Sequence, residues 1–228
     1  MARGGTKLVT TQVSNYAELK EAVTNSTCDI VKLTADIDVK TDAMDAGEYF
    51  MFKRKLTLDL NGKTISSTKD VWNDETKVHA ILEIGEGGDV TITGNGKVVS
   101  NENDAFAVQV SGNGKVTIES GEFVGNIQSV YVLKGSLAIS GGKFSIQQLD
   151  NVLDPETNLV GYGYVINFFD ANYNSSLIEI TGGEFENFNP ANNIAEGENT
   201  NFVKTGYKAV LQENSTATHK VYKVVKEQ

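Results

Sequence analysis

The chain contains little cysteine and little proline. Its 228 residues include one cysteine, Cys28, and two prolines. A single cysteine excludes an intramolecular disulfide and a cysteine-based zinc site. Because Cys28 lies in an apolar stretch just before Ile30, we expect a buried structural thiol. The shortage of proline, together with 22 glycines, favours regular structure joined by many tight turns.

Basic residues are also scarce, and the formal net charge is −10. Nucleic acid and anionic membrane surfaces both require a basic face, so we expect neither as a partner. No segment approaches the ~20 consecutive apolar residues of a membrane-spanning helix. Residues 1–5 lack the apolar core of a secretory signal, so either the gene product is not exported by that route or the chain was trimmed for expression, and we favour a natural start.

The chain is rich in one repeated segment. Each copy alternates apolar and polar residues and then reaches a glycine turn; copies begin at Leu56, Val90, Val116, Leu137 and Ile178. A second short apolar strand precedes the last four copies, at 80–84, 107–110, 130–132 and 164–166. A fixed pattern at irregular spacing is typical of the stacked coils of a solenoid. We therefore predict parallel stacking, with equivalent residues about 4.8 Å apart.

Such stacking predicts columns of like residues in the core. One column contains isoleucines and the other phenylalanines: Ile92, Ile118, Ile139 and Ile180, and Phe123, Phe144 and Phe185. The recurrent glycines are expected at corners where the backbone needs a positive φ. They are therefore interpreted as structural corners and not as a nucleotide-binding loop.

Different elements are expected to close the two ends. A helix is predicted over residues 15–25, with Asn15 as N-cap and Glu18 at capping-box spacing. After Pro190, alternating runs predict a closing β-hairpin, as a solenoid needs capped ends. The predicted organisation is a flexible N-terminal arm over 1–13, coils with their cap helix over 14–190, and a C-terminal capping β element over 191–228.

Segments 15–23, 29–37 and 56–65 resemble the capping helix and first coils of pectin-lyase-like right-handed parallel β-helices. The similarity covers residues 14–190 and implies an all-β fold: a single-stranded right-handed parallel β-helix with an N-terminal capping α-helix and a C-terminal β cap. That superfamily includes polysaccharide lyases, hydrolases, adhesins and phage structural proteins, so it does not choose an activity. The tail contains the segments Asn189-Pro190, Ala195-Glu196-Gly197, Gly206-Tyr207 and Tyr222-Lys223-Val224-Val225. In these segments it is similar to the ends of uncharacterised β-helical proteins from gut bacteria and their phages.

The catalytic residues of that superfamily have no clear counterparts. Its lyases use acidic Ca²⁺ ligands and a basic proton abstractor, but the two arginines, Arg3 and Arg54, precede the central coils. Arg54 is expected to be a solvated edge residue. Hydrolases of the group use clustered aspartates; Asp150 and Asp154 share a loop but form no adjacent pair, and we interpret them as solvating charges. We predict no catalytic residue, no metal site and no cofactor.

Loops that interrupt the coils are the expected place for binding, because a rigid scaffold positions its loops. The longest interruptions are residues 66–78 and 147–163. Trp72, Tyr162 and Tyr173 are the candidate ligand-binding residues, since aromatic rings stack on sugars or on a partner subunit. The alternative is that the tyrosines simply line their loops.

The leading functional prediction is a non-enzymatic structural or binding protein, a phage virion decoration or fibre protein exposed on the particle surface. The expected partners are other virion or surface proteins, a glycan, and two further copies in a homotrimer. The acidic balance fits an outer surface and disfavours packing against the genome. The alternative is an extracellular or cell-surface protein of a gut bacterium, either carbohydrate-active, resembling a lyase or hydrolase, or glycan-binding.

Overall fold

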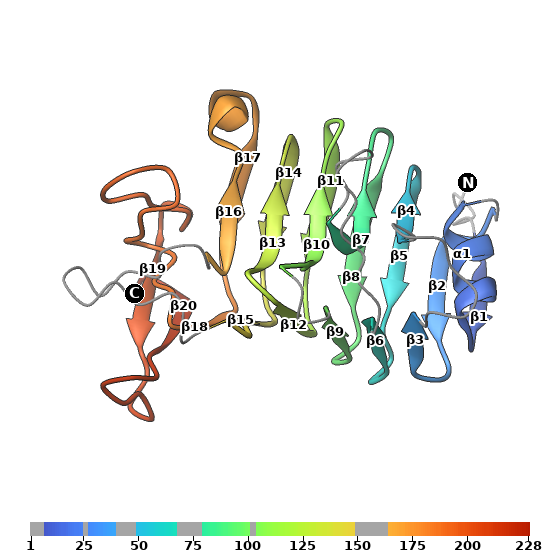
Figure 1. Ribbon diagram of the computed structural model, residues 1–228, viewed down its shortest axis with the longest axis horizontal. Coiled ribbons are helices and arrows are strands. Elements are labelled where there is room, and N and C mark those ends of the chain that lie inside the picture. The colour runs from blue at the N-terminus through green and yellow to red at the C-terminus, as the bar shows by residue number, and fades with distance from the viewer. Residues whose placement is uncertain (1–6, 25–26, 40–48, 68–78, 101–103, 149–163) are drawn as a thin grey trace, which may run out of the picture.

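The computed structural model describes residues 7–24, 27–39, 49–67, 79–100, 104–148 and 164–228. The described chain is mostly β, with one α-helix, α1 (Tyr16–Thr24), and one 3-10 helix, η2 (Asp170–Ser175). Its strands form three sheets, here named A, B and C, and within each sheet successive strands follow one another along the long axis (Figure 1). Within the described helices, none is long and apolar enough to cross a bilayer.

The strands are assigned as follows. Sheet A contains β1 (Thr10–Val13), β2 (Ile30–Leu33), β5 (Lys55–Asp59), β8 (Asp89–Thr93), β11 (Gly114–Ile118), β14 (Gly135–Ile139) and β17 (Leu177–Ile180). Sheet B contains β3 (Ile37–Val39), β6 (Thr64–Ser67), β9 (Lys97–Val99), β12 (Glu122–Gly125), β15 (Lys143–Ile146), β18 (Glu184–Glu186), β20 (Val221–Lys226) and β19 (Tyr207–Leu211). Sheet C contains β4 (Phe50–Phe52), β7 (Ala80–Ile84), β10 (Phe106–Val110), β13 (Gln128–Val132) and β16 (Ile166–Phe168).

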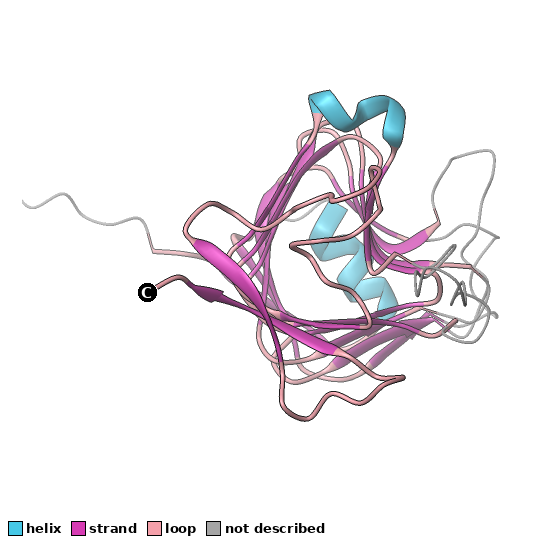
Figure 2. Cartoon of the chain, turned by 90° about the vertical axis from the view of Figure 1, so that its left-hand side faces the viewer, coloured by secondary structure: helices cyan, strands magenta, loops and turns pink. Residues whose placement is uncertain are grey.

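The chain visits the three sheets in turn. β8 lies in sheet A, β9 in sheet B and β10 in sheet C, and β11 then returns to sheet A beside β8. Neighbours within each sheet are parallel up to β17 and β18, and the C-terminal hairpin pairs antiparallel. Viewed along the long axis, the sheets surround a shared interior (Figure 2). One passage through A, B and C is called a rung below.

The register confirms both predicted core columns. In sheet A, Ile92, Ile118, Ile139 and Ile180 are direct partners on successive strands. In sheet B the rings of Phe123 and Phe144 stack with centroids 5.3 Å apart, and those of Phe144 and Phe185 stack at 5.0 Å. All of these side chains are buried. Parallel pairing places equivalent positions next to one another, so a repeated sequence builds columns of one residue type.

The corner glycines also have the predicted conformation. Between sheets A and B, φ is 88° at Gly94, 114° at Gly121, 100° at Gly142 and 96° at Gly183. Side chains are strained in this region, which glycine occupies freely. At Gly94 space is short as well, since a Cβ would lie 2.5 Å from the backbone N of Asn61. The backbone conformation at these corners therefore requires glycine.

The N-terminal helix begins as predicted. Asn15 Oδ1 accepts a hydrogen bond of 3.0 Å from the backbone N–H of Glu18. The carboxylate of Glu18 reaches back to Ser14, accepting bonds from its N–H at 2.7 Å and its hydroxyl at 2.9 Å. These bonds to Ser14 lower the pKa of the Glu18 carboxyl. Leu19, Ala22 and Val23 are the buried residues of α1.

The prediction that Arg54 is a solvated edge residue is wrong. Its guanidinium donates to the carbonyl oxygens of Ala22 at 2.7 Å and Cys28 at 2.6 Å. The Ala22 carbonyl belongs to the last turn of α1, where carbonyls lack partners within the helix. Arg54 therefore ties the end of the helix to the chain that enters β2. Cys28 is buried, with 2% of its surface exposed, as expected for a structural thiol.

Both termini contain strands. Thr10–Val13 forms β1 and pairs with β2, so this part of the predicted arm belongs to sheet A. In the tail, β19 and β20 form an antiparallel hairpin, and β20 pairs antiparallel with β18. The helix α1 and this hairpin thus lie at opposite ends of the stack (Figure 1).

Candidate functional site

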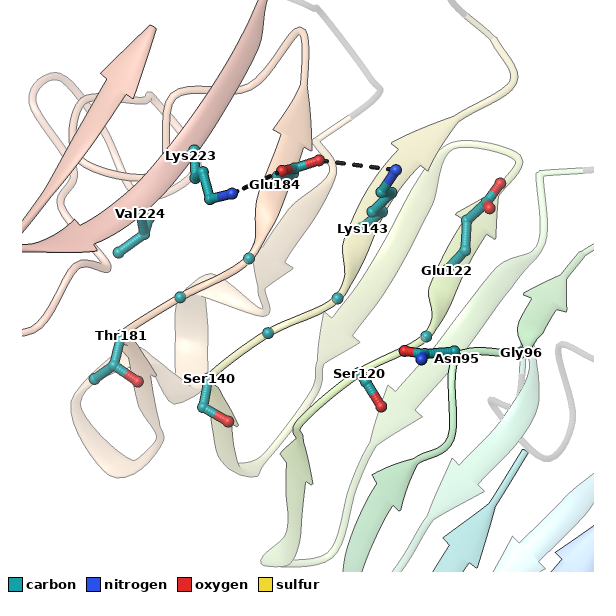
Figure 3. A pocket seen from close by; sticks show the side chains of 15 residues that line it. Asn95, Gly96, Ser120, Glu122, Ser140, Lys143, Thr181, Glu184, Lys223 and Val224 are labelled. Atoms are coloured by element: carbon teal, nitrogen blue, oxygen red, sulfur yellow. Dashed lines mark hydrogen bonds and ion pairs between the residues drawn. The ribbon is translucent and has the colours of Figure 1, made fainter. Parts of the chain in front are cut away.

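An open groove of about 630 Å³ follows the corner between sheets A and B near the C-terminal end (Figure 3). Three successive rungs each contribute a hydroxyl residue, one or two glycines and a charged residue in that sequence order. The hydroxyl and charged side chains lie on opposite sides of the glycine backbone (Figure 3). The principal lining residues are Ser120, Gly121 and Glu122; Ser140, Gly141, Gly142 and Lys143; and Thr181, Gly182, Gly183 and Glu184.

The charged side of the groove alternates in sign from strand to strand. Lys97 and Glu122 are direct partners joined by an ion pair of 2.8 Å. Glu184 lies 3.9 Å from Lys143 and 3.1 Å from Lys223 in the same row. Like charges placed directly opposite one another would be destabilising, so alternation also favours this stacking order. Both carboxylates of the groove are thereby neutralised by lysines.

The hydroxyl side is anchored to the preceding rung. Ser120 Oγ accepts a bond of 2.8 Å from the N–H of Gly94. The hydroxyls of Ser140 and Thr181 donate to the carbonyl oxygens of Ile118 at 3.5 Å and Ile139 at 3.2 Å. A hydroxyl oxygen has two lone pairs, so Ser140 and Thr181 can still accept bonds from a ligand.

A second group of polar side chains lies at the C-terminal end of sheet C. Burial, followed by the charge of Asp170, raises the pKa of Glu196 to about 7. Burial and the same two carboxylates raise the pKa of Tyr131 to about 12, and the pKa of Tyr164 is raised by the same causes. We call these four residues the carboxylate–tyrosine cluster. With one carboxyl partly protonated near neutrality, the cluster has the components for proton transfer.

The loop that carries Glu196 is tightly hydrogen-bonded. Asn193 and Thr200 exchange two backbone bonds of 3.0 and 2.9 Å, and Thr200 Oγ1 accepts from the N–H of Glu196 at 3.2 Å. The carboxylate of Glu196 accepts from the backbone of Phe168, at the end of β16. The position of Glu196 is therefore determined by the loop and not only by its own side-chain rotamer.

A third polar feature crosses the middle of sheet C. Glu83, Gln109, Tyr131 and Asn167 are register partners on four adjacent strands. Glu83 is 1% exposed, and its carboxylate accepts a hydrogen bond from the hydroxyl of Ser111. Within the described chain, its other oxygen has no hydrogen-bond partner. Burial raises the pKa of Glu83 to about 7.

The predicted ligand-binding residues are mostly outside the described chain. Trp72 and Tyr162 lie outside the described residues, as do Asp150 and Asp154. The backbone of Tyr173 lies in η2, and its side chain is not among those described. The ligand-binding role of these aromatic residues stays a prediction.

The sequence signals for the observed clusters are weak. Glu83 is detectable, because it is the one charged residue in the apolar strand Ala80–Ile84. Glu196 enters the sequence argument only within the tail's resemblance, and no spacing connects it to Asp170. The groove follows from the repeat, but the alternation of charge between rungs requires the register to be known.

Within the described residues, no group of three or more histidine, cysteine, aspartate and glutamate side chains is placed to hold a metal ion. Comparison with protein-family models, with curated proteins and with solved structures finds no match to this chain. The functional proposals below therefore rest on the geometry and on the resemblance drawn from the sequence.

Proposed function

We propose that the three parallel sheets are the faces of a right-handed parallel β-helix that serves as a non-enzymatic structural and binding scaffold on a virion surface. The repeated order A, B, C and the continuous parallel register from β1 to β18 support this fold. The helix α1 at one end and the β19–β20 hairpin at the other fit the two caps that a solenoid requires.

The observation that carries the scaffold function is the ion pairing in the groove. Glu122 and Glu184 are each held by lysines at 2.8 and 3.1 Å. Opposite charges on directly opposite strand positions stabilise the pairing of neighbouring strands. The groove therefore combines a row of ion pairs that stabilises the stack with hydroxyl groups that can bond a ligand.

The virion location rests on the tail's resemblance and on the acidic composition. With a net charge of −10, the chain is suited to an outward-facing position. The proposed partners are other virion or surface proteins, together with two further copies of the chain in a homotrimer.

The test of this function uses the particle and the free protein. Immunogold electron microscopy of the particles should label their outer surface, and sedimentation should give the mass of a trimer. Incubation with neutral and anionic polysaccharides should release neither reducing ends nor unsaturated products. Sustained turnover by the purified chain would overturn the non-enzymatic assignment.

A second candidate, a carbohydrate-active protein, is favoured by the carboxylate–tyrosine cluster. Glycoside hydrolysis commonly uses two carboxyl groups, one of which is protonated near neutral pH. Glu196, with a pKa of about 7 beside Asp170, has that character. Release of reducing ends that disappears in Glu196→Gln, and persists in Glu198→Gln on the same loop, would establish this candidate. Turnover absent from all three proteins would leave the scaffold function in place.

A further inference from the structure

We propose that the groove between sheets A and B binds an extended, uncharged, hydroxyl-rich chain, a neutral linear glycan lying along the stack of rungs. This inference rests on the proposed scaffold function and names its ligand class. None of the four residues of the carboxylate–tyrosine cluster is among the residues that line this groove.

The direction of the ligand follows from the repetition of the lining. Three successive rungs present the same order of groups, beginning at Ser120, Ser140 and Thr181. Adjacent parallel strands are about 4.8 Å apart, so hydroxyl side chains recur at that interval along the groove and charges of one sign at about twice that interval. A repetitive polymer can use the hydroxyl contacts of every rung, whereas a compact ligand can use only one set.

The absence of net charge in the lining favours an uncharged ligand. Lys143 and Lys223 balance Glu122 and Glu184. An anionic polymer would meet both carboxylates on a protein whose net charge is −10. Hydroxyl groups can donate to the carboxylates and accept from the ammonium groups, and they can exchange bonds with Ser140 and Thr181.

The backbone bonding of the corner favours a glycan over an extended peptide. The carbonyl oxygens of Gly121, Gly142 and Gly183 accept bonds from the N–H groups of Lys143, Glu184 and Val224 on the next strand. A peptide binds as an added strand only at an edge with unpaired backbone groups. Within this corner those carbonyls are already engaged, so side chains provide the ligand contacts.

The ends of the groove also differ. Lys223 and Val224 from β20 line one end, beside Thr181 and Glu184, and Asn95 and Gly96 line the other (Figure 3). The N–H of Val224 donates to Gly183 at 3.0 Å, which fixes β20 across the last rung. The chain of sugars is therefore expected to extend from β20 towards Asn95.

The experiment is an ¹⁵N–¹H NMR titration of the full chain. The probes are neutral linear hexasaccharides of cellulose, mannan, laminarin and xylan, with oligogalacturonate as the anionic comparison. At least one neutral probe should shift the amides of Gly121, Gly142 and Gly183, and oligogalacturonate should not. Ser140→Trp fills the groove from an exposed position and should weaken binding by at least about tenfold.

Thr218→Trp, at an exposed site in the β19–β20 loop, is the matched control and should bind as the unmodified chain does. Melting curves of both variants report whether the fold is retained. Shifts confined to residues outside the groove, equal affinity in Ser140→Trp, or no shift with any neutral probe would overturn the inference. If the chain is trimeric, catalytically inert and bound to the particle but binds none of the probes, only this inference is overturned. Turnover of a polysaccharide would remove the scaffold function instead.

Discussion

Individual residues in this protein often act on chain segments far from them in sequence. Arg54 holds the carbonyls of Ala22 and Cys28, which precede it by 32 and 26 residues. Glu83 is buried in a strand whose neighbours determine its environment. The local sequence gives no sign of the bonds of Arg54, and it shows Glu83 only as a charged residue in an apolar strand, because the carbonyls and the burial come from stacking. Each role gives a prediction at the scale of one side chain.

Replacing Glu83 by glutamine should remove a pH-dependent loss of stability. The pKa of Glu83 is raised from 4.5 to about 7 in the folded state, so the protonated form favours folding. The protonated carboxyl contributes its full stabilisation of the fold below about pH 4.5, and this stabilisation is lost as the pH rises through 7. At pH 8 we expect Glu83→Gln to unfold with a free energy about 3 kcal/mol higher than the unmodified chain.

Urea unfolding at pH 4.5 and pH 8 measures this difference, which should be close to zero at the lower pH. Glu86→Gln, on an exposed residue nearby, is the control and should alter neither value. An equal effect of Glu83→Gln at both pH values would contradict the buried, protonated carboxyl.

Replacing Arg54 by lysine should loosen the N-terminal helix although the charge is kept. Two guanidinium nitrogens serve two carbonyls, and a single ammonium on a different stem cannot reproduce both bonds. We expect a loss of about 1–3 kcal/mol in the free energy of unfolding. Guanidinium titration followed by circular dichroism measures it, with Lys53→Ala, an exposed neighbour, as the control.

At the scale of elements, the strands are stabilised chiefly through the columns that they share. The phenylalanine column joins β12, β15 and β18, and Phe144 contacts a ring on each side. These columns could be predicted from the sequence because strand alternation has a period of two and parallel stacking preserves position. The cap of α1 was predictable for a similar reason, since Asn15 and Glu18 interact within one turn.

Truncating the middle ring should cost more than truncating an exposed one. We expect Phe144→Ala to lower the free energy of unfolding by about 3–5 kcal/mol, because it removes buried contacts and leaves a cavity between two rings. Phe169→Ala is the control, since Phe169 is 42% exposed, and should change stability by less than about 0.5 kcal/mol. Similar losses in the two variants, measured by urea titration, would contradict the role of the column.

At the scale of the whole molecule, the ends of the sheets determine whether the chain stays separate from other copies or associates with them through its strand edges. An uncovered strand edge presents unpaired backbone groups to other chains. The hairpin β19–β20 covers the edge of β18 through antiparallel pairs between Glu184 and Lys223, Phe185 and Tyr222, and Glu186 and Val221. The cover is thus part of sheet B itself.

Removing residues 205–228 should expose that edge. We expect the shortened chain to associate in a concentration-dependent way, beyond any assembly of the full chain, as measured by light scattering after gel filtration. The full chain at the same concentrations is the reference. Identical mass distributions for the two chains would contradict the capping role of the hairpin.

The sequence by itself determined the rungs: the alternating strands, the glycine corners and the isoleucine and phenylalanine columns. Each depends on backbone conformation or on a position within one repeat, so local chemistry is sufficient. Only the tertiary structure decided what the rungs bring together, including Arg54 with Ala22, Asp170 with Glu196, and the lysines with the glutamates along the groove. These contacts depend on register between segments that are distant in the chain, and electrostatic interactions and burial act through space and not along the backbone.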